Sequence, residues 1–275
     1  MHRAVVFVNF HKEHSKSVCE EIRLELEQRG AAVHICNPED HQRFSSQDHI
    51  DIVFSLGGDG TVLYAARMFA ATTTPILPVH LGTVGFLAGV EKNQWLTVYE
   101  QWLKHQARIS LRCMLEFFVE RAGQLVYQGI CLNDVVTASQ GIAKLIRLQV
   151  KTELNPGELA DIGSYRCDGL IIATPTGSTG YSMAAGGPVL DPEMEALIVT
   201  PICSFNLAKR PLVLPSRQPV MVSVESEQRS GVLLTVDGQD TFKLEPDDIL
   251  SVRHSPHYAR LISVNRSLHY WRRNA

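Results

Sequence analysis

The sequence predicts two domains, a doubly wound, Rossmann-like α/β domain followed by an antiparallel, β-sandwich-like domain. Over the first hundred residues short apolar strands alternate with amphipathic helices, which is typical of a parallel sheet. From about Ile109 one strand follows another with short turns such as Asp237-Gly238, which is typical of antiparallel pairing. The 275 residues suffice for two ordinary domains. We expect an α/β domain over 1–108, a β domain over 109–257, and a return of 258–275 to the first domain.

The expected α/β domain contains four strands and three helices. The strands are expected over residues 4–8, 33–36, 50–56 and 76–79. Ser15 is expected to cap the first helix, whose apolar residues recur every four positions, and Gly30 to close it. A second helix is expected over 62–70, and Asn93 is expected to cap a third.

In the β domain, apolar runs separated by turn residues mark the strands. These are expected over 111–120, 125–130, 145–152, 170–173, 220–224, 232–236 and 249–253. Two segments, 179–185 and 193–199, are expected to be helical.

Charge and composition exclude several classes of partner. The net charge of −3 provides no basic field for a nucleic-acid backbone, so no nucleic-acid partner is expected. No run approaches the roughly 20 apolar residues of a membrane span, so no membrane partner is expected. The six cysteines form no C-x-x-C pair and are typical of a reducing compartment. We therefore expect a cytoplasmic protein without a structural metal.

The segment GGDGT, residues 57–61, is the first with a chemical signature. It follows an apolar strand, and its three glycines let a phosphate approach the backbone closely. A loop built only to hold phosphate would not contain a carboxylate, because like charges repel. Asp59 is explained if it orders Mg²⁺ or receives a proton from an attacking hydroxyl. The alternative is a tight turn that uses Gly and Asp for their backbone tolerance.

The second such segment runs from Asp168 to Leu190, DGLIIATPTGSTGYSMAAGGPVL. A buried strand leads into a small, hydroxyl-rich turn, 176–180, which supplies donors beside an accessible backbone. The stretch G-S-T-G does not match the G-x-S-x-G of serine hydrolases. The turn is therefore a candidate ligand site, with a purely structural role as the alternative.

Five segments in the right order resemble the NAD kinases. They are GGDGT, LNDVV (132–136), DGLIIATPTGSTGYSMAAGGP, KRPLVLP (209–215) and VDGQ (236–239). The long glycine-rich segment is very specific to that family, whereas GGDGT is shared with diacylglycerol and sphingosine kinases. The chain contains neither the P-loop pattern nor the G-x-G-x-x-G of dehydrogenases.

The resemblance implies transfer of the γ-phosphoryl group of ATP to the 2′-hydroxyl of the adenosine ribose of NAD, with Mg²⁺ or another divalent cation. It implies that Asp59 is the general base and that the protein forms a homo-oligomer, a dimer or tetramer. The positions that match the family's ligand positions are Gly57, Gly58, Gly60, Thr61, Phe86, Asn133, Asp134, Lys144, Arg166, Asp168, Thr179, Gly180, Tyr181, Ser182, Met183, Ala184 and Gln239.

Several of these positions also have structural explanations. Lys144 is equally expected as a solvated strand residue, Arg166 and Asp168 as a surface pair on one strand, and Gln239 as part of a hairpin turn. Gly180 stands where most of the family has Ala, and residues 204–208 differ from the commoner forms.

Two other functions remain open from the sequence. One is a lipid kinase of the same superfamily, which the glycine-rich segment disfavours. The other is a non-catalytic NADP-sensing module, which the retained Asp59 disfavours because a carboxylate beside phosphates does not help binding.

Overall fold

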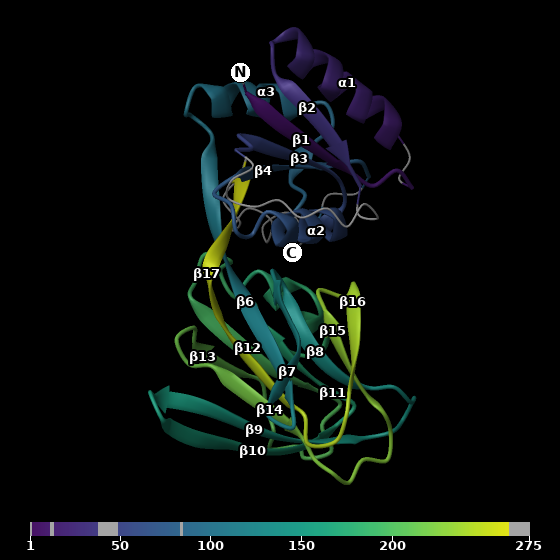
Figure 1. Ribbon diagram of the computed structural model, residues 1–275, viewed down its shortest axis with the longest axis vertical. Coiled ribbons are helices and arrows are strands. Elements are labelled where there is room, and N and C mark those ends of the chain that lie inside the picture. Colours follow the sequence, from purple (N-terminus) through teal and green to yellow (C-terminus); the bar gives the residue numbers. More distant parts are fainter. Residues whose placement is uncertain (1, 12–13, 38–48, 83–84, 264–275) are drawn as a thin grey trace. The chain divides into compact units, whose positions relative to one another are not determined.

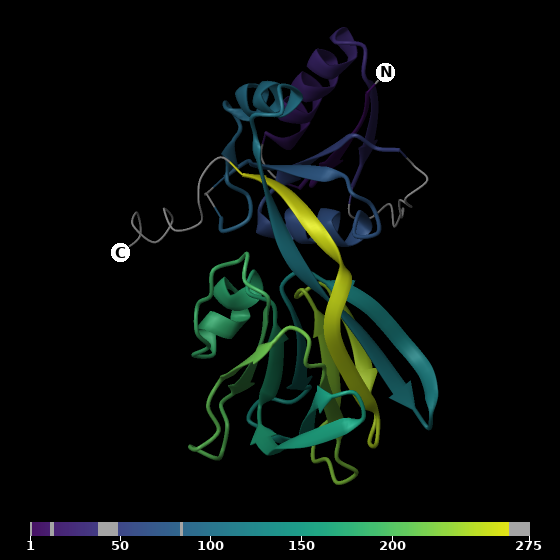
Figure 2. The same cartoon turned by 90° about the vertical axis from the view of Figure 1, so that its left-hand side faces the viewer.

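The structure is a computed structural model that describes residues 2–11, 14–37, 49–82 and 85–263 (Figure 1). The chain divides into two compact units, Met1–Arg112 with His257–Ala275, and Cys113–Pro256. It passes from one unit to the other within strand β6 (Arg108–Arg121) and again within β17 (Ile249–Ser263). In Figure 2, β17 is the long yellow strand.

The first unit contains a parallel sheet with strand order β17-β4-β3-β1-β2. Its strands besides β17 are β1 (Arg3–Val8), β2 (Ala32–Cys36), β3 (Ile52–Gly57), β4 (Pro75–His80) and the short β5 (Val90–Glu91), which pairs with β4. The end of β17 joins this sheet parallel to β4, with Arg260 opposite Pro75. The expected return of the C-terminal stretch to the first domain is thus confirmed for residues 258–263, and 264–275 lie outside the described residues.

Helices cover both faces of this sheet. α1 (Ser15–Gln28) and α3 (Trp95–Leu103) lie on one face and α2 (Asp59–Met68) on the other (Figure 1). Alternate strand residues such as Val6 and Phe54 pack with α1 and α3 in one core cluster. This is the expected doubly wound arrangement, which follows from the apolar runs of strands that are buried on both faces.

Three helix starts differ from the expectation. α1 begins at Ser15 itself, because His14 takes the capping position with a left-handed φ of 62°. α3 is preceded by Gln94 rather than Asn93. α2 begins at Asp59, three residues earlier than expected, which places this carboxylate in the first helical turn.

The second unit is built of antiparallel strands in two packed layers. One layer has the order β13-β12-β11-β8-β15-β16. Its strands are β13 (Leu212–Pro215), β12 (Ala196–Ile202), β11 (Gly169–Ala173), β8 (Asp134–Ser139), β15 (Val232–Val236) and β16 (Asp240–Leu244). The other contains β6, β17, β7 (Gln124–Cys131), β9 (Ile146–Asn155), β10 (Glu158–Cys167) and β14 (Val220–Val224). Side chains from both layers, such as Leu148 and Ile172, share one core, so the expected sandwich-like fold is confirmed.

The helix expected over 193–199 is wrong. Residues from Ala196 onward form strand β12, which pairs with both β11 and β13. The β-branched run Ile198, Val199 and Thr200 is buried, and two neighbouring strands satisfy its backbone. The helix expected over 179–185 is divided into a 3₁₀ turn, η2 (Gly177–Thr179), and the single turn α4 (Tyr181–Ala184).

Within the part of the chain that the structure describes, no helix is long and apolar enough to cross a membrane.

Candidate active site

The GGDGT segment joins the carboxyl end of β3 to the start of α2. Gly57 is the last residue of β3, Gly58 precedes the helix in an extended conformation, and Asp59 begins it. Gly57 packs so closely on Thr61 that an added Cβ would overlap the Thr61 hydroxyl. In a doubly wound sheet, ligands bind at this edge, and the amides of a helix N-terminus attract anions.

The carboxylate of Asp59 accepts three backbone N–H bonds from the loop that follows β4. Oδ2 accepts from Phe86 at 2.9 Å, and Oδ1 accepts from Leu87 at 3.0 Å and from Ala88 at 2.9 Å. The carboxylate also fills the space beside Gly85, where any Cβ would overlap it. Asp59 therefore fixes this loop. The loop includes Phe86, whose backbone N–H binds Asp59 and whose ring is partly exposed.

In the second unit, a bend precedes β8 and carries two predicted ligand residues, Asn133 and Asp134. The carboxylate of Asp237 accepts the backbone N–H groups of Leu132 at 3.1 Å, of Asn133 at 2.7 Å and of Asp134 at 3.2 Å. Asp237 lies in the turn between β15 and β16 and was not among the predicted site residues. Because Asp-Gly is an ordinary hairpin signal, the sequence offered no means of recognising this second use.

The side chains of Asn133 and Asp134 both lie beside Gly180. A Cβ at Gly180 would stand 3.6 Å from the Asn133 amide nitrogen and 4.0 Å from Oδ2 of Asp134. The amide oxygen of Asn133 is buried and has no hydrogen-bond partner among the described residues. An acceptor that is buried without a partner is costly, so this oxygen is suited to a ligand's hydroxyl.

Asp134 is 5% exposed, and its electrostatic surroundings are unfavourable to a charge. Burial, and then the charge of Asp237, raise the pKa of the Asp134 carboxyl to about 7. No basic side chain among the described residues lowers this pKa. Asp134 therefore changes protonation close to neutral pH.

The turn after β11 is held against the same bend. The Thr174 hydroxyl donates to the Leu132 carbonyl at 2.6 Å and accepts the Gly177 N–H at 3.0 Å. Gly177 lies so close to Asn133 that a Cβ would overlap the Asn133 carbonyl. The polar turn that the sequence singled out therefore adjoins Asn133 and Asp134.

In α4, one residue is buried and its two neighbours are exposed. The Ser182 hydroxyl is fully buried and lies 2.9 Å from the Thr200 hydroxyl, so it is already hydrogen-bonded within the protein. Tyr181 is half exposed, and Met183 is 40% exposed. The exposed side chains of this short helix are thus the Tyr181 ring, the Met183 thioether and the methyl of Ala184.

Family descriptions match both units of the fold. The ATP-NAD kinase N-terminal domain matches residues 3–107, and the ATP-NAD kinase C-terminal domain matches residues 132–264. The NAD kinase of Treponema denticola is 34% identical over 263 residues, covering 95% of this chain and 90% of the relative. That of Geobacter sulfurreducens is 36% identical over 284 residues, covering 98% and 96%. The chain belongs to the NAD kinase family.

Two solved structures share this NAD kinase fold. A yeast NADH kinase complexed with NADH aligns with a TM-score of 0.84 at 23% identity, covering 96% of this chain and 84% of that one. An NAD kinase from Archaeoglobus fulgidus in complex with ATP aligns with a TM-score of 0.75 at 23% identity, covering 98% and 96%. The chain is therefore a phosphotransferase with NAD kinase activity, and that prediction from the sequence is confirmed over the lipid-kinase alternative.

Other residues predicted from the NAD kinase resemblance lie at the far end of β8 from Asn133. The Asp168 carbonyl accepts the N–H of Ser139, the last residue of β8. Ser139 follows Asp134 by five positions along this extended strand, a distance of about 17 Å. Gln239 lies in the turn between β15 and β16, two residues from Asp237, whose carboxylate accepts the Asn133 N–H.

The alternative explanations for this second group also need correction. Lys144 lies exposed in the loop between β8 and β9, not on a strand. Arg166 is on β10, but Asp168 lies between β10 and β11, so the two do not share a strand. The Arg166 guanidinium lies 5.1 Å from the centre of the Phe205 ring.

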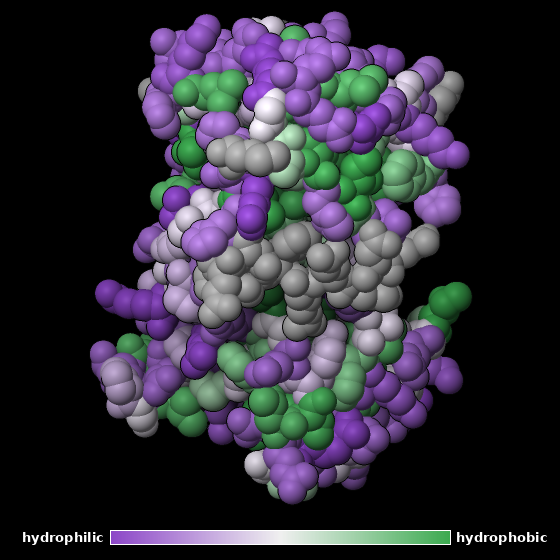
Figure 3. All heavy atoms as spheres, turned by 45° about the horizontal axis from the view of Figure 1, so that its top comes forward, coloured by the Kyte–Doolittle hydropathy of each residue, from purple (hydrophilic) through white to green (hydrophobic). Residues whose placement is uncertain are grey.

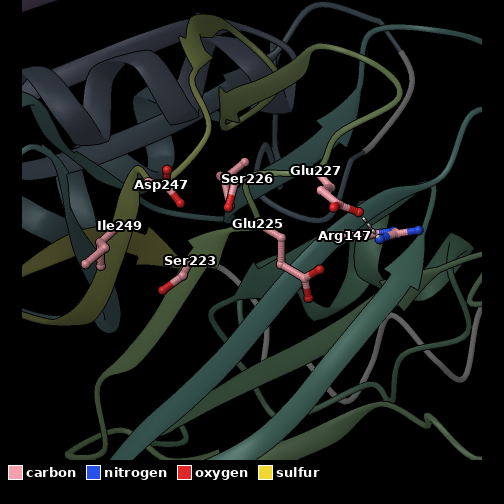
Figure 4. Close-up of a pocket in the computed structure, with 8 residues that line it drawn as sticks. Arg147, Ser223, Glu225, Ser226, Glu227, Asp247 and Ile249 are labelled. Atoms are coloured by element: carbon pink, nitrogen blue, oxygen red, sulfur yellow. Dashed lines mark hydrogen bonds and ion pairs between the residues drawn. The ribbon is translucent and has the colours of Figure 1, made fainter.

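A hollow of about 590 Å³ lies elsewhere in the second unit and contains none of the predicted site residues (Figure 4). Its lining includes Glu225, Glu227 and Asp247, and Arg147 forms an ion pair with Glu227 at 3.3 Å. An acidic lining does not suit the phosphates of a nucleotide, because like charges repel.

Proposed function

We propose that this NAD kinase transfers the γ-phosphoryl group of ATP to the 2′-hydroxyl of the adenosine ribose, with Asp59 receiving the hydroxyl proton. The observation that carries this is the placement of Asp59 on the first turn of α2, beside the glycines that end β3. Oδ2 of Asp59 accepts one N–H bond, and a carboxylate oxygen has two lone pairs, so one remains for a substrate hydroxyl. The three amide bonds also hold the group in place during proton transfer.

The donor's phosphates are proposed to meet the backbone of Gly57, Gly58 and Gly60 and the start of α2, near Thr61 and Phe86. Among these residues none is basic, so Mg²⁺ or another divalent cation would neutralise the charge that develops on the phosphates. The described residues contain no group of three or more His, Cys, Asp or Glu that could hold a metal. The ion therefore fits best as a companion of the phosphates, which is how Mg²⁺ commonly binds.

The acceptor ribose is proposed to bind Asn133 and Asp134, with the adenine on the turn beside them. The unpartnered Asn133 oxygen and the exposed Tyr181 ring support this. The resemblance adds further contacts, which stay proposals: Lys144, Arg166, Asp168, Thr179, Gly180, Ser182, Met183, Ala184 and Gln239. The Ser182 hydroxyl is buried and bonded to Thr200, so we propose that Ser182 supports the turn rather than contacting the nucleotide directly.

A coupled assay tests this function directly. The purified protein is incubated with ATP, Mg²⁺ and NAD, and NADP is measured with an NADP-specific dehydrogenase. Matched reactions replace NAD by diacylglycerol or sphingosine. We expect NADP to form and neither lipid to be phosphorylated. Binding of NADP without turnover would instead support the sensing module.

We also propose that the protein is cytoplasmic and forms a homo-oligomer. Five of its six cysteines are buried, as expected for a reducing compartment. On the face shown in Figure 3, hydrophilic residues predominate and hydrophobic ones form separate small groups. The second unit nevertheless exposes several large apolar side chains, namely Leu159, Phe205, Leu207, Leu212 and Val213. Light scattering during size-exclusion chromatography should give a dimer or tetramer, and a monomeric mass would contradict this.

A further inference from the structure

The carboxylate of Asp237 binds the backbone of a neighbouring segment. Its two oxygens accept the N–H groups of three consecutive residues, 132–134, at 2.7 to 3.2 Å. In return, the Asp237 N–H donates to the Asp134 carbonyl at 3.0 Å. The segment 132–133 is a bend, and β8 begins only at Asp134.

The bend has a direct consequence for side-chain direction. In a regular strand, consecutive side chains point to opposite faces. Asn133 and Asp134 instead both approach Gly180, within 3.6 Å and 4.0 Å of its Cβ position. Because the backbone bends here, the N–H groups of residues 132–134 need hydrogen-bond acceptors other than a neighbouring strand. The Asp237 carboxylate provides them.

The same carboxylate acts on Asp134 through its charge. Asp237 is itself 94% buried, so its negative charge is weakly screened. It stabilises the protonated form of Asp134 and, together with burial, moves the pKa of that residue upward. No other charged group among the described residues contributes to this shift, whether from β8, from β11 or from the turn at Gly180.

We propose that Asp237 is a positioning residue for the acceptor ribose: its carboxylate holds the bend that turns Asn133 and Asp134 to one side, toward Gly180. This rests on the proposed role of Asn133 and Asp134 in binding the ribose. In this proposal Asp237 acts on the ribose through Asn133 and Asp134, whose backbone amides its oxygens accept.

The test variant is Asp237→Asn. Asn tolerates the left-handed φ of 50° at this position as well as Asp does, so the backbone is not newly strained. The amide has one acceptor oxygen instead of two, and it carries no charge. We expect kcat/KM for NAD to fall by up to about 100-fold, the usual cost of misplacing a reacting group by about 1 Å. KM for ATP should stay unchanged.

The pH profile separates positioning from mere stability. In the wild type, kcat/KM for NAD should fall as pH drops below about 7, where Asp134 becomes protonated. In Asp237→Asn this acid limb should move to lower pH, because the repelling charge is gone. If the variant does not fold, Asp237→Ser, whose hydroxyl still accepts one N–H, is measured in its place.

Asp248 provides the matched control. It is also a buried aspartate, in the connection between β16 and β17. Its carboxylate accepts the Glu245 N–H at 2.8 Å and forms an ion pair with Arg121 at 2.8 Å. Asp248→Asn should lower the melting temperature while leaving the acid limb of the pH profile in place. A shift of that limb in Asp237→Asn beyond the control supports the proposal. Identical profiles for the two variants overturn it.

A double-mutant cycle with Asp134→Asn tests the positioning role of Asp237 separately from the proposed ribose site. If Asp237 acts through Asp134, the double variant should lose much less than the product of the single losses in kcat/KM. Independent, multiplicative losses would overturn the positioning role. If Asp134→Asn alone leaves kcat/KM for NAD unchanged, the proposed ribose site is wrong, whatever Asp237 does.

Discussion

Asp59 fixes the loop that follows β4, and a catalytic task is proposed for the same carboxylate. Its carboxylate orders the loop at 86–88 through three amide bonds, and we propose that it also takes a proton from the substrate. A substitution at Asp59 therefore changes loop order and proton transfer together. A second variant is needed to separate the two effects.

For Asp59→Asn we expect a kcat that is about 10²- to 10⁴-fold lower, because the amide cannot accept the proton. The matched control is Gly85→Ala, which forces the new methyl against the Asp59 carboxylate but keeps the carboxylate in the protein. Steady-state kinetics should show a much larger loss of kcat in Asp59→Asn than in Gly85→Ala. A kcat of Asp59→Asn close to that of the wild type would mean that Asp59 is not the base and only fixes the loop.

Asp134 should make the protein less stable at high pH. The pKa of Asp134 rises from 3.8 to about 7 on folding, so its favourable contribution is complete below pH 3.8 and is lost as pH rises through about 7. This rise in the pKa of Asp134 corresponds to at most about 4 kcal/mol of stability. Asp134→Asn should therefore raise the free energy of unfolding at pH 8.

Urea unfolding of this variant and of the wild type at pH 5 and pH 8 measures the effect. The gain in Asp134→Asn should shrink toward pH 5, where the wild-type carboxyl is already protonated. The same variant should bind NAD more weakly at pH 8, because one acceptor atom is lost. A pH-independent stability difference would contradict the raised pKa.

At the level of elements, two glycines three residues apart in the turn after β11 should respond differently to Ala. At Gly177, the methyl would overlap the backbone carbonyl of Asn133, which cannot move without disturbing the bend. At Gly180, the nearest atom is 3.3 Å away and φ is −96°, outside the left-handed region that favours glycine. Gly177→Ala should cost about 1–3 kcal/mol of stability, as overpacking does.

Gly180→Ala should change stability by less than about 1 kcal/mol. Thermal melts of both variants, with KM for NAD, provide the comparison. Gly177→Ala should also raise KM, since the bend carries Asn133. If the two variants melt at the same temperature, close approach at Gly177 does not hold this turn.

The strand β12 shows why one element was assigned wrongly from the sequence. Residues 193–199 begin with alternating acidic and apolar residues, which suit a helix. The β-branched residues that follow are buried between β11 and β13, and this pairing outweighs a short helical pattern. Local periodicity could not reveal partners that are 13 or more residues away along the chain.

For the whole protein, we expect activity to require a divalent cation. The predicted site residues of the first unit include no Lys or Arg, so the charge that develops during phosphoryl transfer needs an external cation. Turnover should disappear in excess EDTA and return on addition of Mg²⁺. Circular dichroism in EDTA should stay unchanged, which separates loss of the ion from loss of the fold. Undiminished turnover in EDTA would contradict the prediction.

The sequence alone determined that this chain has an α/β domain followed by a β domain, and that it belongs to the NAD kinase family. Alternating strands and helices give way to consecutive strands because the apolar period changes, and GGDGT with the long glycine-rich segment indicates NAD kinase. These features are local, so they can be recognised without knowing the partners of each residue.

Only the tertiary structure decided how the candidate site is supported. Asp237 and Asn133 are about a hundred residues apart in the sequence, yet they form a hydrogen bond of 2.7 Å. Asp59 likewise binds the backbone at residues 86–88, although strand β4 lies between them in the sequence. Likewise, the pKa of Asp134 depends on burial and on Asp237, neither of which is visible at its own position in the sequence. Such effects arise from contacts between distant segments, and those contacts exist only once the chain has folded.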